Sequence, residues 1–202
     1  MRQGLRLFGL AVGLAVAIAP AWGAQSPREN IARLNAVLLD VMKNADGLGF
    51  KGRRAALRPV MSELYDFAFM ARIAVGGYWK SLAPRDRERL VDAFERMSIA
   101  IYAARFDGYS GERFEIVSDE KSVRNTVLVK TRLIRPAGGP VALHYLTRDK
   151  GGDDWRIIDV FLDARFSELA RMRADYTSVI KRRGFEKLIE TIEARIAEMA
   201  GG

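Results

Sequence analysis

The hydrophobic pattern of this chain changes its period twice, and that change restricts the folds that the chain can adopt. Apolar residues recur at helical spacing before residue 106, alternate along several stretches between residues 113 and 162, and return to helical spacing after residue 167. Short turns rich in glycine, proline and aspartate separate the alternating stretches, which predicts antiparallel hairpins. This order predicts an α+β fold, with several amphipathic helices packed on one face of a curved antiparallel sheet of about four strands.

The helical stretches carry recognisable start and stop signals. Ser26 and Pro27 form a pair typical of a helix N-cap and first turn, Ser167 is placed to begin a later helix, and Gly184 is placed to end it. Pro59 interrupts or restarts the second stretch. The expected helices cover residues 27–46, a stretch from about 53, 63–73, about 84–107, 167 to about 183, and 185–199.

The strands are predicted from alternation alone. They cover residues 113–117, 126–134, 141–148 and 155–162. The pattern of the stretch that ends at Val160 does not identify its inward face. The two middle strands each place one set of side chains in phase, namely Val127, Val129, Thr131 and Leu133, and Val141, Leu143, Tyr145 and Thr147.

The N-terminus has the layout of a secretory signal peptide. Arg2 and Arg6 precede the apolar run Leu7–Ala19, which at 13 residues is short for a membrane-spanning helix. Pro20 breaks the run, and small residues then mark a cleavage site after Gly23. We therefore predict a signal peptide at residues 1–23 and a single exported domain at 24–202, in preference to an uncleaved N-terminal anchor.

Composition excludes several classes of function. The chain has no cysteine, which excludes disulfide scaffolds, zinc fingers and cysteine nucleophiles. Its 33 Lys and Arg residues against 25 Asp and Glu residues give a formal charge of +8. In an exported protein this charge favours anionic lipid headgroups or an acidic protein surface over nucleic acid. Much of it is interleaved with acids, as on a solvated helix face.

Candidate catalytic groups are few, and each has a simpler structural interpretation. The single histidine, His144, lies within a predicted strand, in phase with Ala142 and Leu146. Asp66 and Asp159 are embedded among apolar or aromatic residues. A buried acid of this kind can be a general acid, but it can equally pair with an arginine or cap a helix, and we favour the structural role. We predict no catalytic residues, no metal site and no enzyme activity.

The order of several motifs resembles that of the MlaC family of periplasmic lipid-binding proteins, over about residues 30–195. The first half carries Tyr65-Asp66-Phe67, Met70-Ala71-Arg72, Gly76, Tyr78-Trp79, Leu82, Pro84, Phe94 and Tyr102. The second half carries Tyr109-Ser110-Gly111-Glu112-Arg113-Phe114, Val129-Lys130-Thr131-Arg132-Leu133, Trp155-Arg156-Ile157-Ile158-Asp159-Val160, Ser167, Gly184-Phe185 and Leu188. The Tyr109–Phe114 stretch leans toward the hopanoid-associated branch of that family, called HpnM.

This resemblance implies a soluble carrier without a cofactor, which holds lipid tails in an apolar cavity between the sheet and the helices. Its cargo would be a phospholipid or a hopanoid-type lipid. Its partners would be an inner-membrane ABC lipid transporter and an outer-membrane lipoprotein complex, with transient contact at a membrane surface. Headgroups would lie near Lys130, Arg132 or Arg165. The candidate lipid-binding residues are Phe67, Met70, Ile73, Trp79, Phe94, Met97, Ile101, Val127, Val129, Thr131, Leu133, Leu143, Tyr145, Ile157 and Val160.

Two other functions compete with a lipid carrier. A periplasmic adaptor could bind a membrane-protein partner through its basic surface without carrying lipid, and a filled core would favour it. A small hydrolase could use Asp66 or Asp159, and a polar cleft with two convergent acids would favour it. The sequence does not distinguish a filled apolar core from a hollow one.

Overall fold

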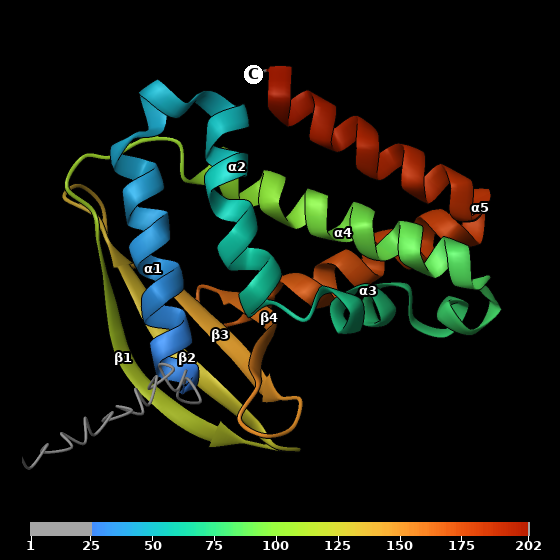
Figure 1. The fold of residues 1–202 in the computed structure, drawn as a ribbon, viewed down its shortest axis with the longest axis horizontal. Helices are drawn as coiled ribbons and strands as arrows, with labels where there is room; N and C mark the ends of the chain where they lie inside the picture. The colour runs from blue at the N-terminus through green and yellow to red at the C-terminus, as the bar shows by residue number, and fades with distance from the viewer. Residues whose placement is uncertain (1–25, 202) are drawn as a thin grey trace, which may run out of the picture.

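The computed structural model describes residues 26–201, so the predicted signal peptide at 1–23 lies outside the described residues. Within that range, no helix combines the length and the hydrophobicity that a membrane span requires. Helices come first, the sheet follows, and a long broken helix ends the chain (Figure 1). The helices are α1 (Pro27–Lys43), α2 (Ala45–Leu64), α3 (Phe67–Val75), the 3-10 helix η1 (Gly76–Ser81), α4 (Pro84–Arg105) and α5 (Glu168–Gly201).

The sheet is antiparallel, and its strands lie side by side in chain order. This confirms the predicted α+β class. The two-residue strand β5 was not predicted, because its pairing with the end of β4 depends on a tight turn rather than on alternation. The strands are β1 (Arg113–Ser122), β2 (Thr126–Ile134), β3 (Val141–Asp149), β4 (Trp155–Leu162) and β5 (Phe166–Ser167).

The predicted helix signals act as expected at both ends of the chain. The Ser26 side chain accepts a hydrogen bond from the Glu29 backbone N–H, and the Glu29 carboxylate accepts one from the Ser26 backbone N–H, which completes a capping box. The Ser167 Oγ accepts a hydrogen bond from the Ala170 backbone N–H at 2.9 Å at the start of α5. Gly184 interrupts α5 with φ 82° and ψ 176°, so the helix turns there.

Three helix boundaries differ from the predicted ones. Pro59 lies inside α2 and does not interrupt it. The chain stays helical through most of 45–52, because only Gly49 of the glycines there has a positive φ, of 56°. The predicted helix at 63–73 is instead split after Leu64. At the split the Asp66 backbone N–H donates to the Ile157 carbonyl at 2.9 Å, so pairing with β4 overrides local helix propensity.

A β-bulge explains why alternation did not show the inward face of β4. Leu146 pairs with Asp159 and Thr147 pairs with Ile157, which leaves Ile158 as an extra residue. As a result Ile157 and Val160 both face the helices although they are three positions apart, and both are buried. Alternation in β2 and β3 is regular, and Val129 lies opposite Tyr145 on the buried face.

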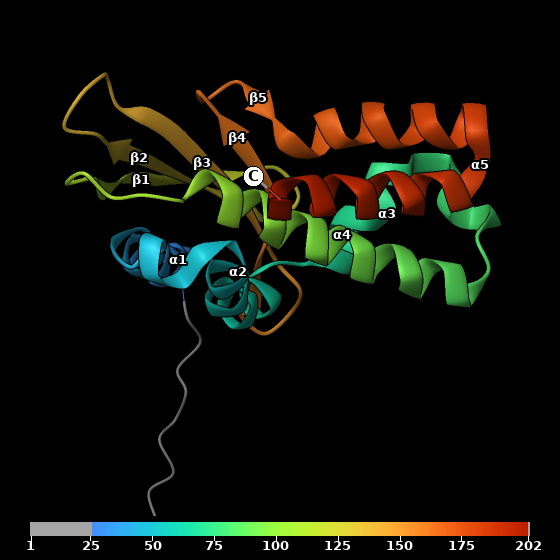
Figure 2. The same cartoon turned by 90° about the horizontal axis from the view of Figure 1, so that it is seen from above.

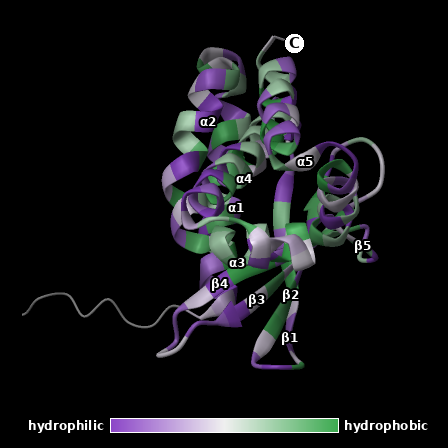
Figure 3. Ribbon diagram, turned by 90° about the vertical axis from the view of Figure 1, so that its right-hand side faces the viewer, coloured by the Kyte–Doolittle hydropathy of each residue, from purple (hydrophilic) through white to green (hydrophobic). Residues whose placement is uncertain are grey.

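The helices lie on one side of the sheet. Helix α1 lies in front of the first strands, and α3, α4 and α5 extend beyond β4 (Figures 1 and 2). Hydrophobic residues of β2 and β3 lie beneath the helices (Figure 3).

The second half of α5 returns along α4, held by bidentate pairing of Arg89 with Glu186, at 2.8 and 2.7 Å, and by Arg96 with Glu193. The turn at Gly184 therefore sets where both halves of α5 lie.

We predict that Gly184→Ala lowers the free energy of unfolding by about 1–3 kcal/mol. The φ and ψ of Gly184 lie in a region that is almost confined to glycine, whereas no atom lies within 4 Å of a Cβ built there, so the cost comes from the backbone alone. Gly47→Ala is the matched control, because Gly47 lies in α2 without a positive φ and also has an open Cβ position, so it should stabilise slightly. Urea unfolding measures the free energy of unfolding of both variants. Equal changes in the two variants would show that the backbone conformation of Gly184 does not require glycine.

Candidate functional site

A cavity of about 280 Å³ lies between the sheet and the helices. Helices α3 and α4, strands β2 to β4 and the first turns of α5 contribute its walls. Most of the side chains that line it are apolar. They are Tyr65, Met70, Ser98, Ile101, Tyr102, Arg105, Phe106, Leu133, Val141, Leu143, Val160, Leu162, Glu168, Leu169 and Met172.

Five predicted lipid-binding residues line this cavity, namely Met70, Ile101, Leu133, Leu143 and Val160. The other predicted residues lie elsewhere. Ile73 and Val127 are partly buried and pack against the core, and Trp79 borders a separate surface depression with Pro84 and Arg87. The remainder are buried in the core outside the cavity lining, namely Phe67, Phe94, Met97, Val129, Thr131, Tyr145 and Ile157.

The period of the sequence indicated the correct face of β2 and of β3, but not the position of the hollow along them. Thr131 shows the difference, since it shares a face with Leu133 but is fully buried and donates its hydroxyl hydrogen to the Leu143 carbonyl. The hollow instead lies toward the last turns of α4 and the first turns of α5. Val141 is in phase with Leu143 and could therefore have been predicted as a lining residue. The sequence around Glu168, Leu169 and Met172 gives no sign that these residues line a cavity.

Paired tyrosines form one wall of the cavity. The Tyr65 hydroxyl donates to the Tyr102 hydroxyl at 2.7 Å, and the two rings meet edge to face. Burial raises the pKa of Tyr65 and of Tyr102 well above the usual value, and it does the same for nearby Tyr145. These hydroxyls therefore stay neutral at physiological pH, and among the described lining residues the charges come from Arg105 and Glu168.

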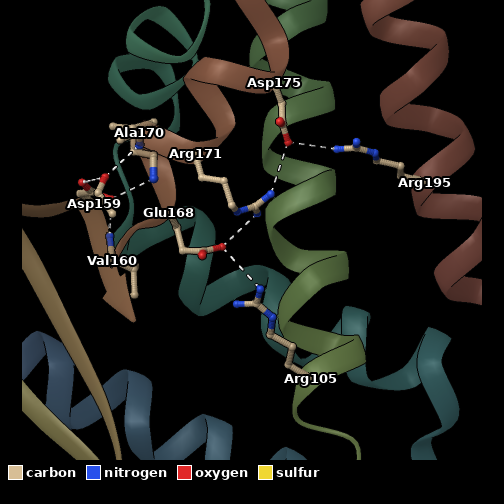
Figure 4. A network of polar contacts seen from close by, with 10 residues as sticks. Arg105, Asp159, Val160, Glu168, Ala170, Arg171, Asp175 and Arg195 are labelled. Carbon is tan, nitrogen blue, oxygen red and sulfur yellow. Dashed lines mark hydrogen bonds and ion pairs between the residues drawn. The ribbon is translucent and has the colours of Figure 1, made fainter. Parts of the chain in front are cut away.

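Arg105 and Glu168 belong to a charged network that joins α4 to both halves of α5 (Figure 4). The Glu168 carboxylate pairs with Arg105 at 3.5 Å and with Arg171 at 3.1 Å. Asp175 pairs with Arg171 at 3.4 Å and with Arg195 at 3.7 Å. We call these five residues the mouth network. It holds three cations and two anions, so it carries one net positive charge.

The two acids that the sequence singled out fix helix starts and do not line the cavity. The Asp66 carboxylate accepts from the Phe69 backbone N–H at 3.1 Å and pairs with Arg148 at 2.8 Å. The same guanidinium lies 4.0 Å from the centre of the Phe69 ring. Asp66 therefore caps α3 and ties it to β3, as the structural interpretation predicted.

Asp159 holds the corner between β4 and α5 (Figure 4). Its carboxylate accepts from the Val160 backbone N–H at 2.7 Å, the Ser167 hydroxyl at 2.6 Å and the Leu169 backbone N–H at 3.1 Å. Burial raises the pKa of Asp159, and the three donors oppose that rise. The contacts place Leu169 against the cavity.

The basic residues expected near a headgroup lie away from the cavity lining. Lys130 and Arg132 are on the opposite face of β2 from Thr131, where they pair with Glu120 at 2.6 Å and with Glu115 at 3.5 Å on β1. Strand alternation sends neighbours to opposite faces, so two residues beside an inward Thr131 could not face the hollow. Arg165 lies in the turn before β5, beside the Phe166 ring.

Comparison with known proteins places the chain in a family. A protein-family model described as MlaC protein matches residues 33–194, most of the chain, and the chain belongs to the MlaC family. A curated relative from Haemophilus influenzae, named intermembrane phospholipid transport system binding protein MlaC, is 24% identical over 123 residues. That match covers 59% of this chain and 56% of the relative, so the chain spans about half the length of the relative it matches.

A solved structure shares the fold. It is a phospholipid-binding protein from Ralstonia solanacearum in complex with a phospholipid, with a TM-score of 0.75 and 19% sequence identity. The match covers 87% of this chain and 99% of that one. The helices and the sheet described above are therefore the MlaC fold.

We predict that Asp159→Ala lowers the free energy of unfolding by about 2–3 kcal/mol, because it leaves two buried backbone N–H groups without an acceptor. Asp92→Ala is the control, since Asp92 is exposed and makes one ion pair with Arg96 on the same helix, so a loss of no more than about 0.5 kcal/mol is expected. Chemical denaturation compares the two. If Asp159→Ala were as stable as the control, the corner would not depend on this carboxylate.

Proposed function

We propose that the protein is a non-enzymatic periplasmic carrier, which holds the apolar tails of a phospholipid in its cavity and moves the lipid between membranes. The hollow cavity carries this proposal. Protein interiors are ordinarily close-packed, and an unfilled void destabilises a protein by about 24 cal/mol per Å³. For a cavity of about 280 Å³ this is at most about 7 kcal/mol, which a bound apolar ligand would offset.

The physical task of such a carrier matches this architecture. Each buried methylene contributes about 0.8 kcal/mol, so a 16-carbon acyl chain faces a cost on the order of 10 kcal/mol when it leaves a membrane for water. Apolar walls such as Met70, Leu143 and Met172 replace the membrane interior. A charged group such as Arg105 beside the apolar lining allows the headgroup to stay at the solvent. Transport of this kind needs no catalytic group.

The proposed partners follow from the family. The relative from Haemophilus influenzae is named as the binding protein of an intermembrane phospholipid transport system. We propose that this chain likewise exchanges lipid with an inner-membrane ABC lipid transporter and an outer-membrane lipoprotein complex. Phe166 is 62% exposed and pairs in the sheet with the lining residue Leu162, which suits transient contact with a membrane surface.

The hollow cavity also separates the carrier from its competitors. A filled core would favour an adaptor that carries no lipid, whereas the described residues line an apolar hollow. A hydrolase would need convergent acids in a polar cleft, whereas Asp66 and Asp159 cap different helices. A hopanoid-type cargo would enter the same apolar space, and extraction of the bound lipid distinguishes it from a phospholipid.

We predict that Ile101→Trp reduces co-purifying lipid at least tenfold, because the larger ring fills part of the cavity. Val91→Trp is the control, since Val91 lies on the same helix but borders the separate surface depression near Trp79. Lipid extraction followed by mass spectrometry measures occupancy, and circular dichroism confirms that each variant is folded. Equal lipid content in both variants would contradict the assignment of the cavity as the tail site.

A further inference from the structure

We propose that Arg105 binds the phosphodiester group of the cargo lipid and that Glu168 is the built-in counter-ion that occupies this arginine when no lipid is bound. The inference rests on the proposed function and adds a headgroup subsite to it. The ligand chemistry is a phosphate diester attached to acyl tails. A lipid with a neutral, phosphate-free headgroup would gain nothing from this subsite.

The position of Arg105 connects the apolar tail site to solvent. It is the last residue of α4 and lies one helical turn after Ile101 and Tyr102, which also line the cavity. Its side chain lines the cavity and is 48% exposed. A lipid with its tails beside Ile101 would therefore place its headgroup near this guanidinium.

The hydrogen-bonding capacity of Arg105 is largely unused. Within residues 26–201 its hydrogen-bond and ion-pair partner is Glu168, at 3.5 Å from one terminal nitrogen. A guanidinium carries five N–H donors, which suit bidentate binding of a phosphate. The single long contact leaves donors free to turn toward an oxyanion without breaking other interactions of the fold.

The surrounding charges favour an anion at this point. Glu168 is shared between Arg105 and Arg171, and its side chain is only 14% exposed. Arg171 and Arg195 in turn share Asp175 (Figure 4). The mouth network thus has one more cation than it has anions, and one phosphodiester with a single negative charge would balance it. The shared Glu168 holds Arg105 in place before the lipid arrives.

The experiment offers the protein vesicles with tracer phosphatidylglycerol, phosphatidylethanolamine or diacylglycerol carrying identical tails, and native mass spectrometry counts the bound lipids. The unmodified protein should bind both phospholipids about tenfold more than diacylglycerol, as expected for charge-assisted hydrogen bonds. Arg105→Gln should bring this ratio close to one, Arg105→Lys should retain part of it, and Glu168→Gln should raise it.

Arg113→Gln is the matched control. It removes the same charge from β1, the next element along the chain, where Arg113 is 63% exposed and pairs with Glu115, so the ratio should not change. Arg105→Lys keeps the test decisive if Arg105→Gln does not fold. An unchanged ratio in folded Arg105→Gln would overturn the headgroup subsite while leaving the carrier intact, whereas failure to bind any of the three lipids would overturn the carrier.

Inorganic phosphate distinguishes a lipid headgroup from a free anion. Millimolar phosphate should leave lipid uptake unchanged, because a free phosphate has no tails to bury in the cavity. Strong inhibition by phosphate, together with retained binding of diacylglycerol, would show that Arg105 serves a free-phosphate site and would overturn the proposal.

Discussion

The carboxylate of Asp159 fixes the corner on which the rest of the molecule depends. It joins the end of β4 to the Ser167 hydroxyl and to the backbone of the first turn of α5. Because α5 starts from this corner, the buried side chains of Leu169 and Met172 form the wall of the cavity that α5 contributes. The turn at Gly184 then returns α5 along α4, where Arg89 and Arg96 hold it. The hollow is thus bounded by elements that are anchored at their ends.

Much of the fold could be predicted because it depends on local chemistry. The capping role of Ser26 and the stop at Gly184 follow from single residue types, and regular alternation identified the inward faces of β2 and β3. The predictions differed from the structure where contacts between residues far apart in the sequence determine the local conformation. The backbone of Asp66 pairs with Ile157 and splits a helix, and the extra residue Ile158 shifts the phase of β4.

The candidate site could be predicted only in part for the same reason. Periodicity shows which side chains face inward, and it identified Ile101 and Leu143, but it treats Val129 and Leu133 alike although only Leu133 borders the hollow. A void is a property of how whole layers are spaced, and no single residue encodes that spacing. The charges at the mouth were missed because Arg105 and Glu168 are far apart in sequence and resemble ordinary solvated helix residues.

If the hollow holds the tails of a phospholipid, native mass spectrometry of the gently purified protein should detect that lipid. A phospholipid carrier should show a mass above that of the lipid-free protein by one phospholipid, and solvent extraction should release that lipid. A protein with only the lipid-free mass, with no lipid in the extract, would show that the hollow is not a tail site. A polycyclic lipid in place of a phospholipid would keep the carrier but contradict the assigned cargo and its phosphate subsite.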